Sequence, residues 1–130
     1  MNIEIEHSPY RASLLWMNKE KIYVFGDNMA RFGTLGQAVI RDEHNAFGVA
    51  TKRYPGRKEE HYFADRDDEF ECVIRDLRLL YMLSKNHTIV FPVNGIGTGL
   101  AQMHKRSPYL WSKMNQILKD HFGYINGVSV

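Results

Sequence analysis

The segment KIYVFGDN, residues Lys21–Asn28, decides the fold class of this chain. Its four consecutive apolar residues, Ile22 to Phe25, favour β-structure and leave no polar face. Such a run predicts a strand that is buried on both faces, which is typical of a parallel sheet in an α/β protein. We expect the strand to end at Gly26, so that Asp27 and Asn28 lie just beyond its carboxyl end.

Three further strands are predicted around this segment. The alternation of polar and apolar residues over Ile3 to Glu6 indicates a short strand at the edge of the sheet. Phe47 to Lys52 and Thr88 to Val93 are the other two. Pro92 must end the last strand or lie at an edge, because proline has no N–H group for a sheet hydrogen bond.

Helices are predicted between these strands. Phe70 to Tyr81 carries apolar residues at helical spacing, and Asp67 or Asp68 can cap this helix. Ser107-Pro108 suits a helix start, with Gly123 at its C-terminal cap. Strands that alternate with helices predict a three-layer α/β fold, with a mostly parallel central sheet flanked by helices. We also expect a brief helix after Pro9, with Leu14, Leu15 and Trp16 on its apolar face. Gln37 to Arg41 is expected to open another helix. Lys52 to Asp68 is expected to be a surface excursion that contains a candidate strand at His61 to Phe63.

Length and composition fit one globular domain over residues 1–130. Hydrophobic residues make up 44% and charged residues 25%, and 17 basic residues face 15 acidic ones. The net charge of +2 is too small to argue for nucleic-acid binding by itself. No apolar run approaches the roughly 18 residues of a membrane span, and the N-terminus lacks the apolar core of a signal peptide. The single cysteine, Cys72, is expected to be a half-buried structural thiol in a cytoplasmic protein.

Two glycine-rich loops each follow a buried strand and precede a helix. They are GDNMARFGTLGQAVIR, Gly26 to Arg41, and NGIGTGLAQ, Asn94 to Gln102. Ligands of open α/β sheets bind beyond the carboxyl ends of the strands, and glycines let backbone N–H groups approach an anion. The two loops therefore predict a cleft for a diphosphate or a nucleotide, unless the glycines only form turns. We expect Gly97 to press against the diphosphate, so that Gly97→Glu would abolish binding and leave the fold intact.

Polar side chains near these loops are candidates for contacts with a ligand. Asn28 could bind a ribose hydroxyl and Asp27 a ribose or an adenine amino group, or the pair could form an Asx-turn. Gln37 could cap its helix or contact a base. His104, just after the second loop, is the best general acid–base candidate, or a surface histidine. The histidines show no HxH or HExxH spacing, so no metal site is expected. Four cationic residues could pair with phosphates or form a solvated basic face: Arg31, Arg41, Lys52 and Arg53.

The pair of loops resembles the macro domain family, which binds ADP-ribose. FGDN, residues Phe25–Asn28, followed by GTLGQA, residues Gly33–Ala38, resembles the Asn-containing turn and first glycine-rich loop of that family. NGIGTGLA, residues Asn94–Ala101, resembles its second loop, which wraps the diphosphate and the distal ribose. A narrower group of macro-like proteins in bacteria and their phages shares the segments FGDN, GQAVIR and NAFG.

The resemblance implies one macro-like domain that binds ADP-ribose or a related nucleotide without a cofactor, in the host cytoplasm if a phage encodes it. Asp27, Asn28 and His104 are the catalytic candidates. Removal of ADP-ribose from a modified macromolecule is left open, because no acidic residue occurs over Leu100 to His104, where hydrolytic members carry a catalytic Asp. The alternatives are a non-catalytic interaction protein, a protein that sequesters a nucleotide signal, or a nucleic-acid binder. The expected ligand-binding residues are Gly26, Asp27, Asn28, Arg31, Gly33, Gly36, Gln37, Ala38, Thr51, Lys52, Asn94, Gly95, Ile96, Gly97, Thr98, Gly99 and Leu100.

Overall fold

The sheet of this chain is parallel throughout. The computed structural model describes residues 1–127, which form a four-stranded sheet with the strand order β1-β4-β2-β3. β1 lies at one edge, as predicted, and β4 ends at Pro92, where a proline can be accommodated. The strands are β1 (Ile3–Glu6), β2 (Lys21–Asn28), β3 (Ala46–Lys52) and β4 (Thr88–Pro92).

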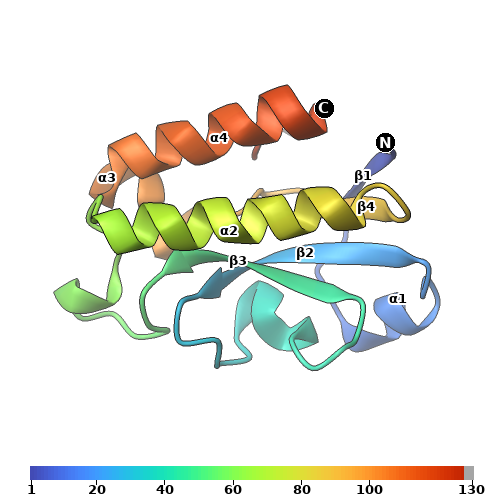
Figure 1. Cartoon of the computed structure of the whole chain (residues 1–130). Coiled ribbons are helices and arrows are strands. Elements are labelled where there is room, and N and C mark those ends of the chain that lie inside the picture. Colours follow the sequence, from blue (N-terminus) through green and yellow to red (C-terminus); the bar gives the residue numbers. More distant parts are fainter. Residues whose placement is uncertain (128–130) are drawn as a thin grey trace.

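Helices cover both faces of the sheet (Figure 1). α2 (Asp67–Leu83) and α4 (Pro108–Phe122) lie over one face, and α1 (Ala12–Trp16) lies over the other with the 3-10 helix η1 (Gly36–Ile40). This arrangement confirms the three-layer α/β fold. No helix within residues 1–127 has both the length and the apolar character that a membrane crossing needs. Shorter turns lie in the connections: η2 (Glu59–His61), η3 (Gly99–Ala101) and α3 (Met103–Arg106).

β2 is buried on both faces, as its sequence predicts. Ile22 and Val24 belong to the larger hydrophobic core, beneath α2 and α4. Tyr23 and Phe25 point to the opposite face and pack with Leu15 of α1. Successive side chains of β2 therefore contribute to two different cores, and the polar residues at its carboxyl end are held from both sides.

Three of the predicted elements differ from those in the structure. β2 does not end at Gly26 but continues through Asp27 and Asn28, because β3 still pairs with both residues across a register shift. The helix expected at Gln37 to Arg41 is a short 3-10 helix. The candidate strand at His61 to Phe63 amounts to one antiparallel bridge between Tyr62 and Lys52.

Two expectations for the outer helices also need correction. Trp16 is 60% exposed rather than part of the buried face of α1, and its indole N–H donates a hydrogen bond to Glu43. The N-cap of α2 is Arg66 instead of Asp67 or Asp68. Glu69, fully buried, accepts a hydrogen bond from the Arg66 N–H and so supplies the helix start with an acceptor.

The start of α4 is capped by a distant residue. Ser107 occupies the N-cap and Pro108 the first turn, as predicted. The Ser107 hydroxyl donates a hydrogen bond to the carbonyl of Met103, however, and does not cap the helix. The carboxylate of Asp65 accepts hydrogen bonds from the N–H groups of Tyr109 and Leu110 instead. Gly123 ends the helix in the left-handed conformation, which confirms its expected role.

Candidate functional site

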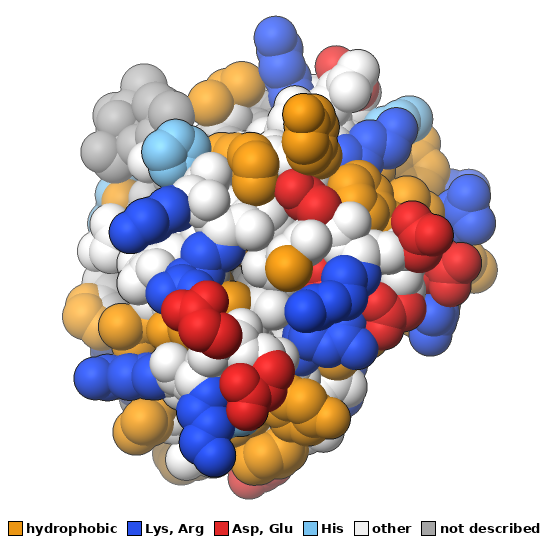
Figure 2. All heavy atoms as spheres, turned by 90° about the vertical axis from the view of Figure 1, so that its left-hand side faces the viewer, with side chains coloured by type: hydrophobic (Ala, Val, Ile, Leu, Met, Phe, Trp, Pro, Cys, Tyr) orange, Lys and Arg blue, Asp and Glu red, His pale blue; other side chains and the backbone are white. Residues whose placement is uncertain are grey.

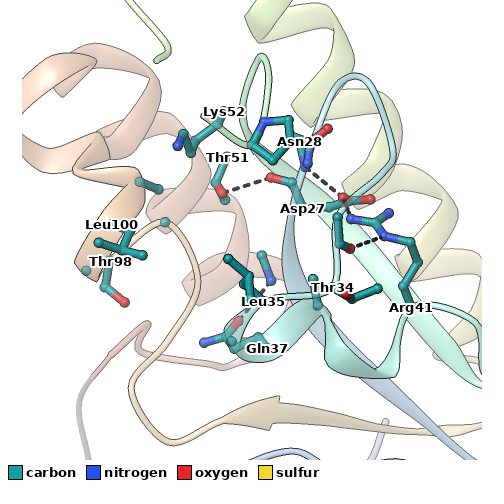
Figure 3. A pocket seen from close by; sticks show the side chains of 18 of the residues that line it. Asp27, Asn28, Thr34, Leu35, Gln37, Arg41, Thr51, Lys52, Thr98 and Leu100 are labelled. Atoms are coloured by element: carbon teal, nitrogen blue, oxygen red, sulfur yellow. Dashed lines mark hydrogen bonds and ion pairs between the residues drawn. The ribbon is translucent and has the colours of Figure 1, made fainter. Parts of the chain in front are cut away.

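A cavity of about 410 Å³ lies at the carboxyl edge of the sheet, between the two glycine-rich loops (Figure 3). Its walls come from the end of β2, the first loop, the end of β3 and the loop that follows β4. Thr98 and Leu100 of the second loop lie on one side, and Arg41 lies on the other. The volume falls in the range of roughly 300–1,000 Å³ that is typical of small-molecule sites.

The expected ligand-binding residues line this cavity, with two exceptions. Ile96 is buried in the larger core, and Arg31 reaches away from the cavity toward α2. His104, the acid–base candidate, is an exposed residue of α3 and does not line the cavity. Six wall residues were not predicted, although all of them belong to the two loops or to the excursion after β3: Phe32, Thr34, Leu35, Pro55, Arg57 and Ala101.

The carboxylate of Asp27 is held between two guanidinium groups. Arg41 binds its Oδ1, and Arg31 binds its Oδ2 at 3.2 Å. The N–H of Asn28 also donates to Oδ1, at 2.7 Å. Asp27 is only 6% exposed, and these three contacts fix its carboxylate and so anchor the first loop.

All three of the expected phosphate-binding arginines are used within the protein, with Arg41 bound to Asp27. Arg31 binds both carboxylate oxygens of Asp76 in α2, at 2.7 and 2.8 Å. Arg53 binds both oxygens of Asp68, and hydrogen bonds to Asp68 and Glu69 raise its pKa. The partners of Arg31 and Arg53 come from α2, far along the chain, so the sequence alone gives no sign of the pairing. The prediction that Arg31 belongs to the ligand site is therefore not supported by its position.

Asn28 has an incomplete set of hydrogen bonds. Its Nδ2 donates to the carbonyl of Phe32 at 2.8 Å, which fixes the orientation of the amide. Its Oδ1 is buried and has no hydrogen-bond partner within residues 1–127. An unpaired buried acceptor costs about 1–3 kcal/mol. Asn28 itself lines the cavity, so a bound hydroxyl or amino group that reached this oxygen would supply a donor.

The side chain of Gln37 ties the two loops together. Its Oε1 accepts a hydrogen bond from the N–H of Gly26, and its Nε2 donates to the carbonyl of Gly95, both at 2.9 Å. Gln37 is thus neither a helix cap nor free to turn toward a base. It fixes the spacing between the end of β2 and the second loop.

The second loop presents a row of unused backbone donors. The N–H groups of Gly97, Thr98, Gly99 and Leu100 donate no hydrogen bond to any group within residues 1–127. Gly97 and Gly99 have φ values of +78° and +58°, a conformation that glycine reaches easily. Successive N–H groups in such turns can form concave sites for anions.

The direction of Gly97 overturns one expectation. A Cβ atom there would lie 2.5 Å from Sδ of Met103 and 3.2 Å from Cε of Met114, both in the core. Gly97→Glu would therefore damage the fold, and the prediction that the fold stays intact is wrong. Gly26 is different, because a Cβ there would meet only cavity-lining atoms: Oγ1 of Thr51 at 3.5 Å, Oε1 of Gln37 at 3.6 Å and the N of Gly97 at 3.8 Å.

The cavity is positively charged. Lys52 and Arg57 line it and form no salt bridge with any acid within residues 1–127. Burial lowers the pKa of Lys52, as do the charges of Arg57 and Arg106. Lys and Arg side chains alternate with Asp and Glu on the surrounding face (Figure 2), so no continuous basic track for a nucleic acid runs across this view.

Within residues 1–127 no cluster of three or more His, Cys, Asp or Glu could hold a metal ion.

Comparison with known proteins identifies a family but no function. Residues 5–117 match the model of a family of unknown function, DUF7831, and the chain belongs to this family. The match extends from β1 into α4 and includes both glycine-rich loops. Searches of the curated proteins and of the solved structures find no match to this chain.

Proposed function

We propose that this chain binds ADP-ribose or a related ADP-ribose-derived nucleotide in the cavity between its two glycine-rich loops. The observation that carries the proposal is the convergence of both loops on one positively charged cavity at the carboxyl edge of a parallel sheet. The likeness of the loops to those of macro domains suggests the class of ligand. An ADP-ribosylated macromolecule would bind in this cavity through its ADP-ribose group.

The chemistry of the walls suits the parts of such a nucleotide. The row of free N–H groups from Gly97 to Leu100 can bind the diphosphate, with Lys52 and Arg57 adding positive charge. Oδ1 of Asn28 can accept a hydrogen bond from a ribose hydroxyl. Exposed apolar side chains at the same cavity, among them Phe32 at 55% exposure, offer a surface on which a base can pack.

The walls favour binding over hydrolysis. Within residues 1–127, Asp27 is the single acidic residue that lines the cavity, and two arginines bind its carboxylate. His104 lies outside the cavity. The proposal is therefore a binding function, which we expect to act in the cytoplasm, where a lone buried thiol such as Cys72 stays reduced.

Calorimetric titration with ADP-ribose, cyclic ADP-ribose, NAD and ATP tests this proposal. We expect ADP-ribose to bind with a Kd in the micromolar range or tighter, which corresponds to about 8 kcal/mol. Leu100→Glu places a carboxylate on the cavity wall at an exposed position, so repulsion of the phosphates should weaken binding at least about tenfold. Leu79→Glu is the matched control, because Leu79 is an exposed leucine of α2 that does not line the cavity.

Two results would count against the proposal. If none of the four nucleotides releases or absorbs heat, the binding function is refuted and a role as an interaction protein is favoured. If Leu100→Glu and Leu79→Glu bind ADP-ribose equally well, the phosphates do not lie at the second loop.

A further inference from the structure

A cationic cluster lies on the side of the cavity that the excursion after β3 forms. Its members are Lys52, Arg57 and Arg106, of which the first two line the cavity itself. The ammonium nitrogen of Lys52 lies 4.6 Å from the centre of the Tyr62 ring, and Cζ of Arg106 lies 3.8 Å from the same point. Because Tyr62 is buried, its ring fixes the places of these two cations.

Hydrogen bonds also hold the cluster in place. The ammonium group of Lys52 donates to the carbonyl of Gly56 in the excursion. Arg106 donates to Oε1 of Gln102 at 2.8 Å and to the two carboxylate oxygens of Glu59 at 3.0 and 2.9 Å. Gln102 directly follows η3, so Arg106 connects the excursion to the end of the second loop. Contacts within the protein therefore position these cations at the cavity.

The positive charge of the cluster is incompletely balanced. Glu59 is the single acid that forms a salt bridge with a member of the cluster within residues 1–127, and its side chain is 84% exposed. Burial lowers the pKa of Lys52, and the neighbouring charges of Arg57 and Arg106 lower it further. The fold thus holds like charges together, and an anion bound among them would relieve their repulsion.

The cluster differs in kind from the row of free N–H groups in the second loop. That row, from Gly97 to Leu100, can bind a diphosphate through uncharged backbone donors. The cluster comes from other elements and offers full charges, including guanidinium groups that match the geometry of phosphate. A phosphomonoester carries a charge of about −1.5 to −2 at pH 7 and three strong acceptor oxygens, so it suits such a cluster.

We propose that the cationic cluster binds a phosphate on the adenosine ribose of the ligand. This inference rests on the proposed function and narrows the ligand class to forms of ADP-ribose that carry a phosphate besides the diphosphate. The diphosphate lies along the second loop, and the adenosine ribose attached to it brings its 2′- or 3′-phosphate to the cluster. An arginine recognises the 2′-phosphate of dinucleotides in other α/β folds by the same chemistry. Arg57 is then a specificity-determining residue, because it distinguishes the phosphorylated ligand from ADP-ribose.

Calorimetry with ADP-ribose and with its 2′- and 3′-phosphorylated forms measures the contribution of the extra phosphate. We expect one phosphorylated form to bind at least about tenfold more tightly than ADP-ribose. Arg57→Gln should reduce this preference to about threefold or less, and it should change the Kd for ADP-ribose by less than about threefold. Lys58→Gln is the matched control, because Lys58 is an exposed neighbour that does not line the cavity, and it should keep the full preference.

The outcomes separate this inference from the proposed function. If neither phosphorylated form binds the wild type more tightly than ADP-ribose, the phosphate subsite is overturned and nucleotide binding stands. The same conclusion follows if folded Arg57→Gln keeps the full preference, or if Lys58→Gln loses as much of it as Arg57→Gln. Failure of the wild type to bind any of the three ligands would overturn both proposals.

Discussion

Asn28 is the residue of the cavity wall whose hydrogen bonds are least complete. Its Oδ1 is buried without a partner, whereas its Nδ2 holds the carbonyl of Phe32 in the first loop. The residue therefore has one structural contact and one unused acceptor. Of the two interpretations that the sequence left open, a ligand contact fits Oδ1 and a local turn fits Nδ2.

Replacing Asn28 with Ala should separate these two contributions. We expect the affinity for ADP-ribose to fall by about 1–3 kcal/mol, because the ligand donor then loses its acceptor. The free energy of unfolding should fall by no more than about 1 kcal/mol, because the lost bond to Phe32 is partly offset by removal of the unpaired oxygen. Calorimetry and urea unfolding of the same protein measure both quantities. A destabilised variant with unchanged affinity would limit Asn28 to anchoring the loop.

The lowered pKa of Lys52 predicts that ligand binding depends on pH. Burial lowers the pKa of this ammonium group, with further contributions from Arg57 and Arg106, so Lys52 loses its proton at a lower pH than an ordinary lysine. A phosphate is attracted only to the protonated form. The affinity for ADP-ribose should therefore decrease as the pH rises toward the ordinary lysine pKa of about 10.4. This decrease should begin at a lower pH than an unperturbed lysine would give.

Lys52→Arg is the control for this pH dependence. A guanidinium group stays charged throughout this range, so the affinity of the variant should change much less with pH. Calorimetry at several pH values compares the two proteins. Parallel pH profiles would show that Lys52 does not carry the dependence.

At the scale of single elements, the start of α4 illustrates a contact between distant parts of the chain. Asp65 supplies the acceptor for the first amides of the helix, and it does so from the left-handed conformation with φ at +58°. Asp and Asn adopt this conformation more readily than most residues. Asp65 thus joins the excursion after β3 to the last helix of the chain.

Asp65→Ala should lower the free energy of unfolding by about 0.5–2 kcal/mol, the usual cost of losing a helix cap, with added backbone strain. Asp65→Asn keeps a side-chain oxygen and tolerates the backbone conformation, so its cost should be smaller. Ser107→Ala should also cost less, because the Ser107 hydroxyl accepts no hydrogen bond from the first N–H groups of α4. Urea unfolding ranks the three variants. If Ser107→Ala proves the most destabilising, the sequence-based cap is correct and the cap by Asp65 is not.

The elements predicted best are those whose signals are local. The apolar run of β2 and the helical spacing in α2 each lie within one short stretch of sequence, and both elements are present. Ion pairs and caps could not be predicted in this way. Arg31 pairs with Asp76 only because α2 packs over the sheet. The sequence places an arginine in the loop but does not reveal that its partner is an acid of α2.

The sequence predicts the position of the cavity, but it predicts the chemistry of the cavity walls only in part. Parallel strands bring their carboxyl ends to one edge, so two loops that follow such strands must lie near each other. The orientation of individual glycines does not follow from this argument. A side chain at Gly97 would point into the core, whereas one at Gly26 would point toward the cavity. Only the path of the backbone distinguishes these two directions.

Gly26 is therefore the position from which the cavity can be filled with least disturbance. A methyl group there would meet only ordinary van der Waals contacts, with Thr51, Gln37 and the backbone N of Gly97. It would occupy the space in front of the first free N–H of the second loop. Gly26→Ala should accordingly fold and melt like the wild type and lose the ligand.

Thermal unfolding of the wild type and of Gly26→Ala, each with and without ADP-ribose, tests the nucleotide site most directly. A ligand at 100 times its Kd stabilises the folded protein by about 2.7 kcal/mol, so the melting temperature of the wild type should rise. Gly26→Ala should melt at the same temperature with and without ADP-ribose. A wild-type protein that shows no shift, or a folded Gly26→Ala protein that shows the full shift, would contradict nucleotide binding between the two loops.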